Sequence, residues 1–394
     1  MRILLASDSY LPYLSGVTVS VDALARGLGA RGHDVLVLAP RPASGALVGG
    51  AGSPGPEPAY AWLASYELHR LVPPGYRMPW PNPAAGAVRD VRRFRPQIVH
   101  AHSPFVTGLL ARRAAREAGV PLVFTHHTRF DDYGHYLGPF ARPGMRLLDA
   151  HLRRFWARCA AVIAPSQDLG REIRARMRRA RVEVIPTGVA VGAIRALAPV
   201  DPRPTADWPP DAIVVASLGR LAPEKSPMLL LEAISVAAER VPELRALVIG
   251  GGPAEGALRL RAAAPDLAGR VAFSGPLPRM EALARLAGAD LFAFASRTET
   301  QGLVLAEALA AGLPAVAVDG PGVRDSVRDG VDGVVVAAEP ATDRGERLGA
   351  AIGTIAADVD ARHVMAERAH DDADRFAVER RVEEVEALYR SLRG

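Results

Sequence analysis

Two glutamates eight residues apart, Glu299 and Glu307, form the pattern in this chain that most strongly suggests chemistry. Glu307 stands in an apolar Ala/Leu-rich stretch that predicts a helix, so its side chain would be buried. A carboxylate buried without a partner costs several kcal/mol. Glu299 stands in the polar run that leads into this helix, where free backbone N–H groups attract phosphate or sugar oxygens. The structural alternatives are a first-turn acid favoured by the helix dipole for Glu299 and a core ion pair for Glu307.

Lys225 is the only lysine among 48 cationic residues. So strong a preference for arginine elsewhere indicates that a compact ammonium group is needed at this position. Lys225 and Arg220 follow a strand predicted at 212–219 and precede a helix predicted at 228–240. A point charge beside a planar guanidinium suits a diphosphate that gains charge as its bond to a sugar breaks. Two solvated loop cations are the alternative interpretation.

Other candidate residues follow predicted strands, at the edge where open α/β sheets bind ligands. Gly16 stands just before a helix predicted at 18–30 and permits close approach to a phosphate or sugar. His126 and His127 leave the strand predicted at 122–125, where a histidine either satisfies local backbone groups or contacts a ligand.

The glycine cluster 250–252 is not a dinucleotide-binding fingerprint, because its spacing differs from G-x-G-x-x-G and the expected acid is missing. We interpret it as a tight turn after a strand, where Gly251 lines a nucleotide site. Backbone groups at 274–277, which include Pro276, are expected to contact the base.

Strands and helices alternate through both halves of the chain, which predicts two parallel sheets, each covered on both faces. The strands expected are 2–7, 33–38, 98–101, 122–125, 161–164, 182–185, 212–219, 244–250, 271–274, 291–295 and 315–318. A proline-rich segment near 198–210 interrupts the pattern. We expect a Rossmann-like domain at 1–190, a linker at 191–210, a second such domain at 211–370 that faces the first across a cleft, and a C-terminal helix at 371–394 able to pack back on the first domain.

Segments 219–227 and 298–314 resemble the Gly-Arg-x4-Lys and Glu-x7-Glu motifs of retaining GT-B glycosyltransferases, in the large family that includes sucrose synthase-like and lipid glycosyltransferases. The resemblance implies that Arg220 and Lys225 hold the donor diphosphate, Glu299 fixes the sugar hydroxyls and Glu307 holds the ribose diol. It includes Gln301, Gly302 and Leu303 in the substrate-binding segment.

The same resemblance gives Gly16 a substrate-binding role in the first domain. It also implies a histidine that contacts the donor sugar, for which His127 before Thr128 aligns best and His126 is the competing choice. It implies no cofactor and no bound metal.

Composition excludes several classes of protein. With 394 residues and 49% hydrophobic content, the chain can bury two cores. Cys159 is the only cysteine, so no intrachain disulfide forms. The N-terminus lacks a signal-peptide layout, and no apolar run reaches the roughly 20 residues of a membrane span. We therefore expect a cytoplasmic protein.

Charge is distributed unevenly along the chain. Residues 1–200 hold 26 Arg and 13 acidic residues, a net +13, whereas residues 201–394 hold 22 cations and 30 acidic residues, a net −8. Within the first part, 142–158 predicts a basic amphipathic helix and 73–80 combines aromatic residues with an arginine, both typical of membrane surfaces. Solvated arginines are the plain alternative. Nucleic acid is not an expected partner, because no binding motif accompanies the basic charge.

The segments 126–136 and 298–302 most resemble bacterial diacylglycerol glucosyltransferases, and phosphatidylinositol mannosyltransferases share much of the pattern. The resemblance implies transfer of glucose from UDP-glucose to a diacylglycerol-type lipid, by an enzyme associated peripherally with the inner face of the membrane. A GDP-mannose donor, a soluble acceptor and a nucleotide-sugar epimerase remain the alternatives.

Overall fold

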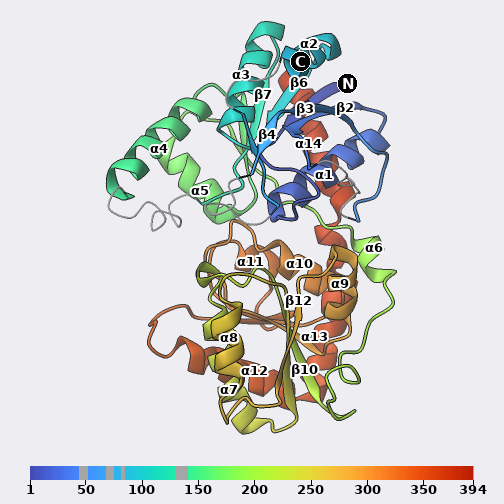
Figure 1. The fold of residues 1–394 in the computed structure, drawn as a ribbon, viewed down its shortest axis with the longest axis vertical. Helices are drawn as coiled ribbons and strands as arrows, with labels where there is room; N and C mark the ends of the chain where they lie inside the picture. The colour runs from blue at the N-terminus through green and yellow to red at the C-terminus, as the bar shows by residue number, and fades with distance from the viewer. Residues whose placement is uncertain (44–51, 68–74, 81–84, 130–140, 394) are drawn as a thin grey trace. The chain divides into compact units, whose positions relative to one another are not determined.

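The computed structural model describes residues 1–43, 52–67, 75–80, 85–129 and 141–393. The chain folds into two compact units (Figure 1). Unit 1 comprises Met1–Ala190 and Ala377–Gly394, and unit 2 comprises Val191–Phe376. The chain therefore leaves unit 1, builds unit 2 and returns to unit 1 with its last helix.

Unit 1 is built on a seven-stranded parallel sheet with the order β3-β2-β1-β6-β7-β8-β9. Its strands are β1 (Arg2–Ala6), β2 (Asp34–Pro40), β3 (Ala59–Leu63), β6 (Ile98–Ala101), β7 (Leu122–Thr125), β8 (Ala161–Ala164) and β9 (Val182–Val184). A two-stranded antiparallel ribbon pairs β4 (Ser65–Tyr66) with β5 (Met78–Pro79). Strand β3 was not predicted from the sequence, because this edge strand follows a Gly/Pro-rich segment and is too short to show a clear alternation.

Six helices accompany this sheet in the described part of unit 1: α1 (Gly16–Ala30), α2 (Ala85–Phe94), α3 (Val106–Ala118), α4 (Ala141–Trp156), α5 (Gln167–Arg176) and α14 (Val378–Arg393). Helix α1 begins two residues earlier than predicted because Ser15 and Thr18 form a reciprocal capping box. On one face of the sheet, a core formed by Leu4, Val99 and Phe124 includes side chains of α4.

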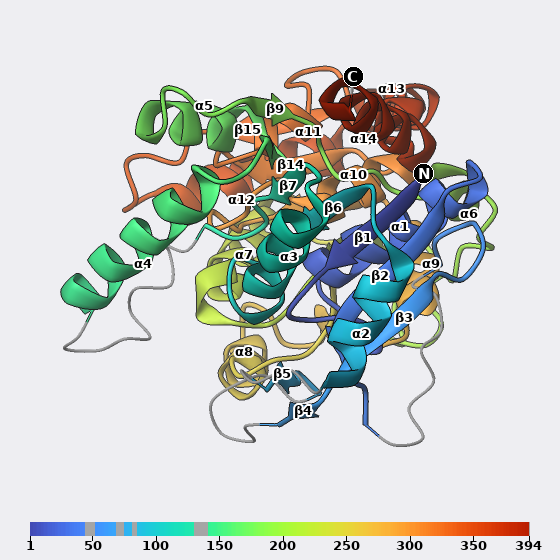
Figure 2. The ribbon, with the colours of Figure 1, turned by 90° about the horizontal axis from the view of Figure 1, so that it is seen from above.

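Helix α4 was predicted to be a basic amphipathic helix, and its two faces differ sharply. Leu152, Phe155 and Trp156 lie in the core of unit 1. The first turns extend away from the rest of the unit (Figure 2), and Leu147 there is 71% exposed. Only the outer face of this helix is therefore available to a partner.

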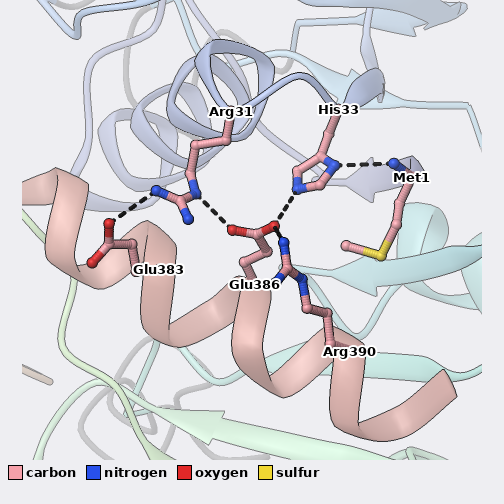
Figure 3. A network of polar contacts seen from close by, with 6 residues as sticks. All are labelled: Met1, Arg31, His33, Glu383, Glu386 and Arg390. Atoms are coloured by element: carbon pink, nitrogen blue, oxygen red, sulfur yellow. Dashed lines mark hydrogen bonds and ion pairs between the residues drawn. The ribbon is translucent and has the colours of Figure 1, made fainter. Parts of the chain in front are cut away.

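Helix α14 packs beside α1 in unit 1 (Figure 1). The absence of a side chain at Gly27 permits this, since a Cβ there would lie 2.5 Å from Val382 Cγ2. At the amino ends of β1 and β2, Glu386 accepts hydrogen bonds from Arg31 Nε at 2.6 Å and Arg390 at 2.6 Å, and its other contact is His33 Nε2 at 2.9 Å (Figure 3). Apolar packing and a buried carboxylate together attach the C-terminal helix.

Unit 2 has a six-stranded parallel sheet with the order β12-β11-β10-β13-β14-β15, the doubly wound arrangement of a Rossmann fold. Its strands are β10 (Ile213–Leu218), β11 (Leu244–Ile249), β12 (Val271–Gly275), β13 (Leu291–Phe294), β14 (Ala315–Val318) and β15 (Gly333–Val336). The edge strand β15, which the sequence analysis did not expect, is only four residues long and follows a turn.

The helices of unit 2 are α6 (Val191–Arg195), α7 (Pro227–Arg240), α8 (Glu255–Ala262), α9 (Arg279–Ala287), α10 (Leu303–Ala310), α11 (Val323–Ser326), α12 (Arg344–Ala357) and α13 (Val359–Asp371), with short 3-10 turns at Pro223–Lys225 and Ala373–Phe376. Helices α7 and α12 pack together on one face of the sheet.

The segment 191–210, predicted to be a linker, belongs to unit 2. It begins with α6, and Val200 N donates to Ala284 O at 2.9 Å. Arg203 forms an ion pair with Asp290 at 2.5 Å. The prolines stop regular structure as expected, but these contacts hold the segment against unit 2, so the boundary falls at residue 190. The second boundary falls at 376 rather than 370, because η3 also belongs to unit 2.

Candidate functional site

The carboxyl ends of β10, β11 and β12 in unit 2 are joined by closely packed loops. Gly219 N donates to Ile249 O at 3.0 Å, and Leu221 N donates to Gly251 O at 3.0 Å. A Cβ at Gly250 would lie 2.0 Å from Gly219 O, so only glycine fits there.

Gly251 and Pro276, predicted to line a nucleotide site from two different loops, are neighbours. A Cβ at Gly251 would lie 3.2 Å from Pro276 Cδ. Gly275, just before the proline, has a φ of 69°, the left-handed conformation that favours glycine. The glycine turn and the segment after β12 therefore share one edge of the sheet.

Lys225 and Glu299, 74 residues apart in sequence, form an ion pair with 2.7 Å between Lys225 Nζ and Glu299 Oε1. Ser296 Oγ donates to the same oxygen at 3.0 Å, and Thr298 Oγ1 donates to the backbone oxygen of Glu224 at 3.0 Å. Both side chains of the ion pair remain about one quarter exposed. The loops after β10 and β13 thus bring two predicted catalytic residues together where a ligand can reach them.

Arg220 lies on the same loop as Lys225 and forms an ion pair with Glu224. The Arg220 side chain is 38% exposed, whereas the Glu224 side chain is almost fully buried. The carboxylate therefore holds the arginine from the protein side.

Glu307 has the partner that its burial requires. The residue is 4% exposed on α10, and its carboxylate forms an ion pair with Arg279, the first residue of α9. This is the core ion pair that the sequence analysis kept as an alternative. Arg279 is a site residue that sequence reasoning missed, since nothing in the sequence indicates which of the many arginines faces Glu307.

Gln301, Gly302 and Leu303 form the entry to α10. Gly302 has a φ of 73° and precedes the first helical residue, Leu303. Gln301 is buried, and Gly322 packs so closely that a Cβ there would lie 2.6 Å from Gln301 Cα. The helix N-terminus is thus held by backbone packing between two loops.

In unit 1, Gly16 is the first residue of α1, and a Cβ at this position would meet nothing within 4 Å. Packing within the unit therefore does not require glycine there. Just after β1, Asp8 Oδ1 accepts from Thr107 N at 2.8 Å, and Asp8 N donates to Ser103 Oγ at 3.0 Å. Burial raises the pKa of Asp8, with the hydrogen bonds from Thr107 opposing the shift.

The two candidate histidines after β7 have different surroundings. His126 is buried, with its ring 5.2 Å from that of Trp156 in an edge-to-face arrangement. His127 is only partly buried as a residue, and its Nε2 lies 2.9 Å from Nδ1 of His102. Burial of the ring lowers the pKa of His127 to about 4, so this imidazole is neutral at pH 7.

His100 and His102, which the sequence analysis did not select, extend this arrangement into the unit. His100 Nε2 lies 2.7 Å from Thr125 Oγ1, and His100 Nδ1 lies 2.6 Å from Tyr389 Oη on α14. The His-x-His pattern at the end of β6 was the available signal, because residues two apart in an extended segment point to the same side.

Some expected features lie outside the described residues. These are 130–136 of the histidine segment and 73–74 of the aromatic stretch. Within the described ranges, no cluster of three or more His, Cys, Asp or Glu side chains has the arrangement needed to hold a metal ion. No helix in the described part of the chain combines the length and apolar character of a membrane span.

Two family models match consecutive parts of this chain. The model described as Glycosyltransferase Family 4 matches residues 14–192, and that described as Glycosyl transferases group 1 matches residues 203–372. An alpha-monoglucosyldiacylglycerol synthase of Acholeplasma laidlawii is 29% identical over 345 residues, covering 85% of this chain and 84% of the relative. A GDP-mannose-dependent alpha-mannosyltransferase of Mycolicibacterium smegmatis is 30% identical over 333 residues, covering 83% and 82%.

Solved structures share the fold. Anabaena HepE in complex with UDP and glucose has a TM-score of 0.73 at 20% identity, with 100% of both chains covered. WaaG, a glycosyltransferase involved in lipopolysaccharide biosynthesis, has a TM-score of 0.68 at 15% identity, with 98% of this chain and 99% of that chain covered. The predicted fold class and family are confirmed: this chain belongs to glycosyltransferase family 4 and is a glycosyltransferase with the GT-B fold.

Proposed function

We propose that this enzyme is a retaining hexosyltransferase that moves glucose from UDP-glucose to a diacylglycerol-type lipid at the inner face of the membrane. The observation that carries the proposal is the ion pair of Lys225 and Glu299 at the carboxyl edge of the unit 2 sheet, beside Arg220. One of its relatives is an alpha-monoglucosyldiacylglycerol synthase, which supports the choice of donor and acceptor.

Electrostatics and positioning account for the proposed chemistry. Arg220 and Lys225 would stabilise the diphosphate as the bond from the sugar C1 to the phosphate oxygen breaks. Lys225 has three N–H donors, so it can keep its bond to Glu299 while binding phosphate. Glu299 would fix the sugar hydroxyls, and Glu307 the ribose diol.

Retention would follow from attack on the face that the leaving group occupies. The acceptor hydroxyl oxygen bonds to C1 of an oxocarbenium-like sugar, and its proton passes to the oxygen of the departing phosphate. His127, uncharged at neutral pH, would contact the sugar as a neutral hydrogen-bonding group. The proposal needs no cofactor, because the two cations supply the charge.

Transfer assays with purified protein test the donor, the acceptor and the stereochemistry together. UDP-glucose and GDP-mannose would each be supplied with diacylglycerol in mixed vesicles, and with free sugars as soluble acceptors. We expect a glucolipid only from UDP-glucose and diacylglycerol, with an α-anomeric proton coupling in its NMR spectrum. A β-linked product would overturn retention.

The other products would identify the alternatives. Formation of a mannolipid from GDP-mannose would identify GDP-mannose as the donor, in keeping with the mannosyltransferase among the relatives. Transfer to free sugars alone would identify a soluble acceptor in place of the lipid. Conversion of the nucleotide sugar without any transfer would indicate an epimerase.

The basic outer face of α4 supports peripheral membrane binding. Arg146, Arg153 and Arg154 are exposed on α4, and Arg158 is exposed just after it, close in sequence to the exposed Leu147. Each cation near an anionic surface contributes about 1 kcal/mol at most. Arg153 also forms an ion pair with Asp149 at 2.7 Å, which reduces its contribution to membrane binding.

Vesicle flotation tests this surface. Replacing Arg146, Arg153, Arg154 and Arg158 with Gln should release the protein from anionic vesicles while UDP binding persists, since the proposed nucleotide site is in unit 2. Binding of the wild type should also fall steeply with salt, because surface charges are screened over roughly 8–10 Å near physiological ionic strength. A folded variant that still floats with anionic vesicles would refute the role of these arginines in membrane binding.

A further inference from the structure

We propose that His102 is a positioning residue that holds His127 in the tautomer protonated at Nδ1, and that Tyr389 of the C-terminal helix anchors this arrangement through His100. The contribution to catalysis rests on the role proposed above for His127. The tautomer itself does not, and it can be measured without an assay.

The three histidine rings form a continuous stack at the carboxyl ends of β6 and β7. The ring centroids of His100 and His102 are 4.1 Å apart, and those of His102 and His127 are 5.2 Å apart. The planes of the His102 and His127 rings differ by 23°. His100 is in β6 and His102 directly follows the strand, two residues further along, which favours the same side for both side chains. The His102 ring thus contacts both the His127 ring and the His100 ring.

All three imidazoles are neutral at pH 7. Burial lowers the pKa of His100 to about 3 and that of His127 to about 4, and it lowers the pKa of His102 well below its usual value. A neutral imidazole has one N–H and one nitrogen lone pair. The 2.9 Å contact between His102 Nδ1 and His127 Nε2 therefore contains a single proton, which belongs to one ring or the other.

The surroundings of His102 decide which ring carries it. His102 Nε2 is buried and has no hydrogen-bond partner among the residues that the structure describes. A buried N–H without an acceptor is rarer in folded proteins than an unsatisfied acceptor. The proton of His102 is therefore on Nδ1, where it is donated to His127 Nε2, and the proton of His127 is on Nδ1. In this tautomer Nδ1 of His127 is a hydrogen-bond donor.

Tyr389 fixes the base of the stack. Its hydroxyl is fully buried and bonds to His100 Nδ1, while Thr125 Oγ1 bonds to His100 Nε2. With a partner on both nitrogens, the His100 ring cannot turn without losing a hydrogen bond, and an unmade buried bond is costly. A residue near the end of the chain therefore helps to orient a side chain after β7.

The polar contacts of α14 provide a matched control. Glu386, three residues before Tyr389, bonds to Arg31, His33 and Arg390 (Figure 3), none of which belongs to the histidine stack. Glu386→Gln loosens the same helix without removing the Tyr389 hydroxyl. The comparison separates a general loss of stability from a specific loss of orientation.

Nitrogen-15 NMR of histidine side chains in the full-length protein tests the assignment. In the wild type we expect His127 to give a protonated Nδ1 and an unprotonated Nε2. His102→Phe keeps an aromatic ring but removes the donor, so the His127 signals should change to those of exchanging tautomers or of Nε2–H. His102→Gln can still donate through its amide and should restore the wild-type pattern.

Kinetics provide the second measurement. His102→Phe should lower kcat roughly tenfold, the loss expected when one hydrogen bond to the reacting group is misdirected, with KM for the donor little changed. Tyr389→Phe should lower kcat less, roughly threefold. His102→Gln and Glu386→Gln should stay near the wild-type kcat at temperatures where they are folded.

Several results would overturn the proposal. A His127 protonated at Nε2 in the wild type would refute the tautomer, and unchanged His127 signals in His102→Phe would refute the positioning role. Unchanged His127 signals in Tyr389→Phe would refute the anchoring role of Tyr389 on α14. A shifted tautomer with unchanged kcat would support positioning by His102 but refute the catalytic role proposed for His127.

Discussion

Both units place polar groups where the strand order of a parallel sheet reverses, but they use different chemistry there. In unit 2 this point lies between β10 and β13, and the ion pair of Lys225 and Glu299 joins the loops that follow these strands. In unit 1 it lies between β1 and β6, where Asp8 bonds to Ser103 and Thr107. Open α/β sheets bind ligands at such points.

The difference in charge extends beyond these contacts. Unit 2 pairs its buried Glu307 with Arg279, and Arg220 with Glu224. Unit 1 instead gathers neutral imidazoles beside its switch point. Paired charges suit a phosphate group whose charge changes during reaction, since a cation can rebalance between a carboxylate and a phosphate. Neutral rings provide directed hydrogen bonds without adding a competing charge.

The largest effect should come from the exposed ion pair of unit 2. Lys225→Ala should cost about 2–4 kcal/mol of transition-state stabilisation, by analogy with removal of one preorganised donor. This corresponds to a fall in kcat/KM of roughly 30- to 1,000-fold. Steady-state kinetics with the donor varied would measure it, and wild-type turnover in this variant would refute the assignment of Lys225.

Lys225→Arg provides the matched control for charge. The guanidinium keeps the positive charge, but its bulk and planar geometry differ from those of a compact ammonium group. We therefore expect activity between that of the wild type and that of Lys225→Ala. Full activity in Lys225→Arg would show that charge alone is needed, and that the single lysine of the chain has no special role.

The sequence predicted much of the unit 2 site because its residues occur in local motifs. The strand before Arg220 and Lys225 is apolar and is followed by a glycine, and Glu299 stands in a polar loop four residues before α10. Their proximity follows once both loops are placed on adjacent parallel strands. Arg279 was missed because pairing between α9 and α10 depends on how the helices pack, which local patterns do not specify.

The sequence predicted less of unit 1. The sequence left two candidates, with His127 preferred and His126 as the competing choice. Their environments differ through contacts that only the fold supplies, Trp156 against His126 and His102 against His127. Tyr389 is 289 residues from His100, so their contact depends on the return of the chain to unit 1. Contacts between distant segments require the tertiary fold.

A buried carboxylate in unit 1 tests whether charge contributes there at all. Burial opposes ionisation of Glu386, but hydrogen bonds from Arg31 and His33 outweigh it and lower the pKa to about 2 from 4.5. Because the pKa is lower in the folded state, the stabilisation is present above about pH 4.5 and is lost as the pH falls through about 2. Its size at neutral pH is about 3 kcal/mol.

Glu386→Gln should therefore lower the stability of unit 1 at pH 7, and the difference from the wild type should shrink as the pH falls below about 4.5. Hydrogen exchange in α14 would measure it. Glu383→Gln is the control, since Glu383 bonds to the same Arg31 at 2.9 Å but is 58% exposed. Such a surface pair contributes about 1 kcal/mol or less. Equal effects in both variants would contradict the importance of burial.

The two glutamates of unit 2 should differ in a way that separates the nucleotide from the sugar. Glu307→Gln should weaken UDP and UDP-glucose binding alike, roughly tenfold, because it removes a charged hydrogen bond to the ribose that both contain. Glu299→Gln should mainly lower turnover. Calorimetry with UDP alone distinguishes them, and an equal loss of UDP affinity in both variants would refute this division of roles.

The smallest effect on function should come from the outer face of α4, and the buried face of the same helix provides the contrast. Leu147 is 71% exposed, so Leu147→Ser should leave stability nearly unchanged but weaken vesicle binding by about 1–2 kcal/mol if this side chain enters the lipid surface. Leu152, five residues later, is 3% exposed in the core of unit 1, and Leu152→Ala should cost about 2–5 kcal/mol of stability. Vesicle sedimentation and thermal unfolding of both variants would measure the contrast. Unchanged vesicle binding by a folded Leu147→Ser would indicate that only the arginines of this face contact the membrane, and a loss of stability in that variant would show that Leu147 packs against protein.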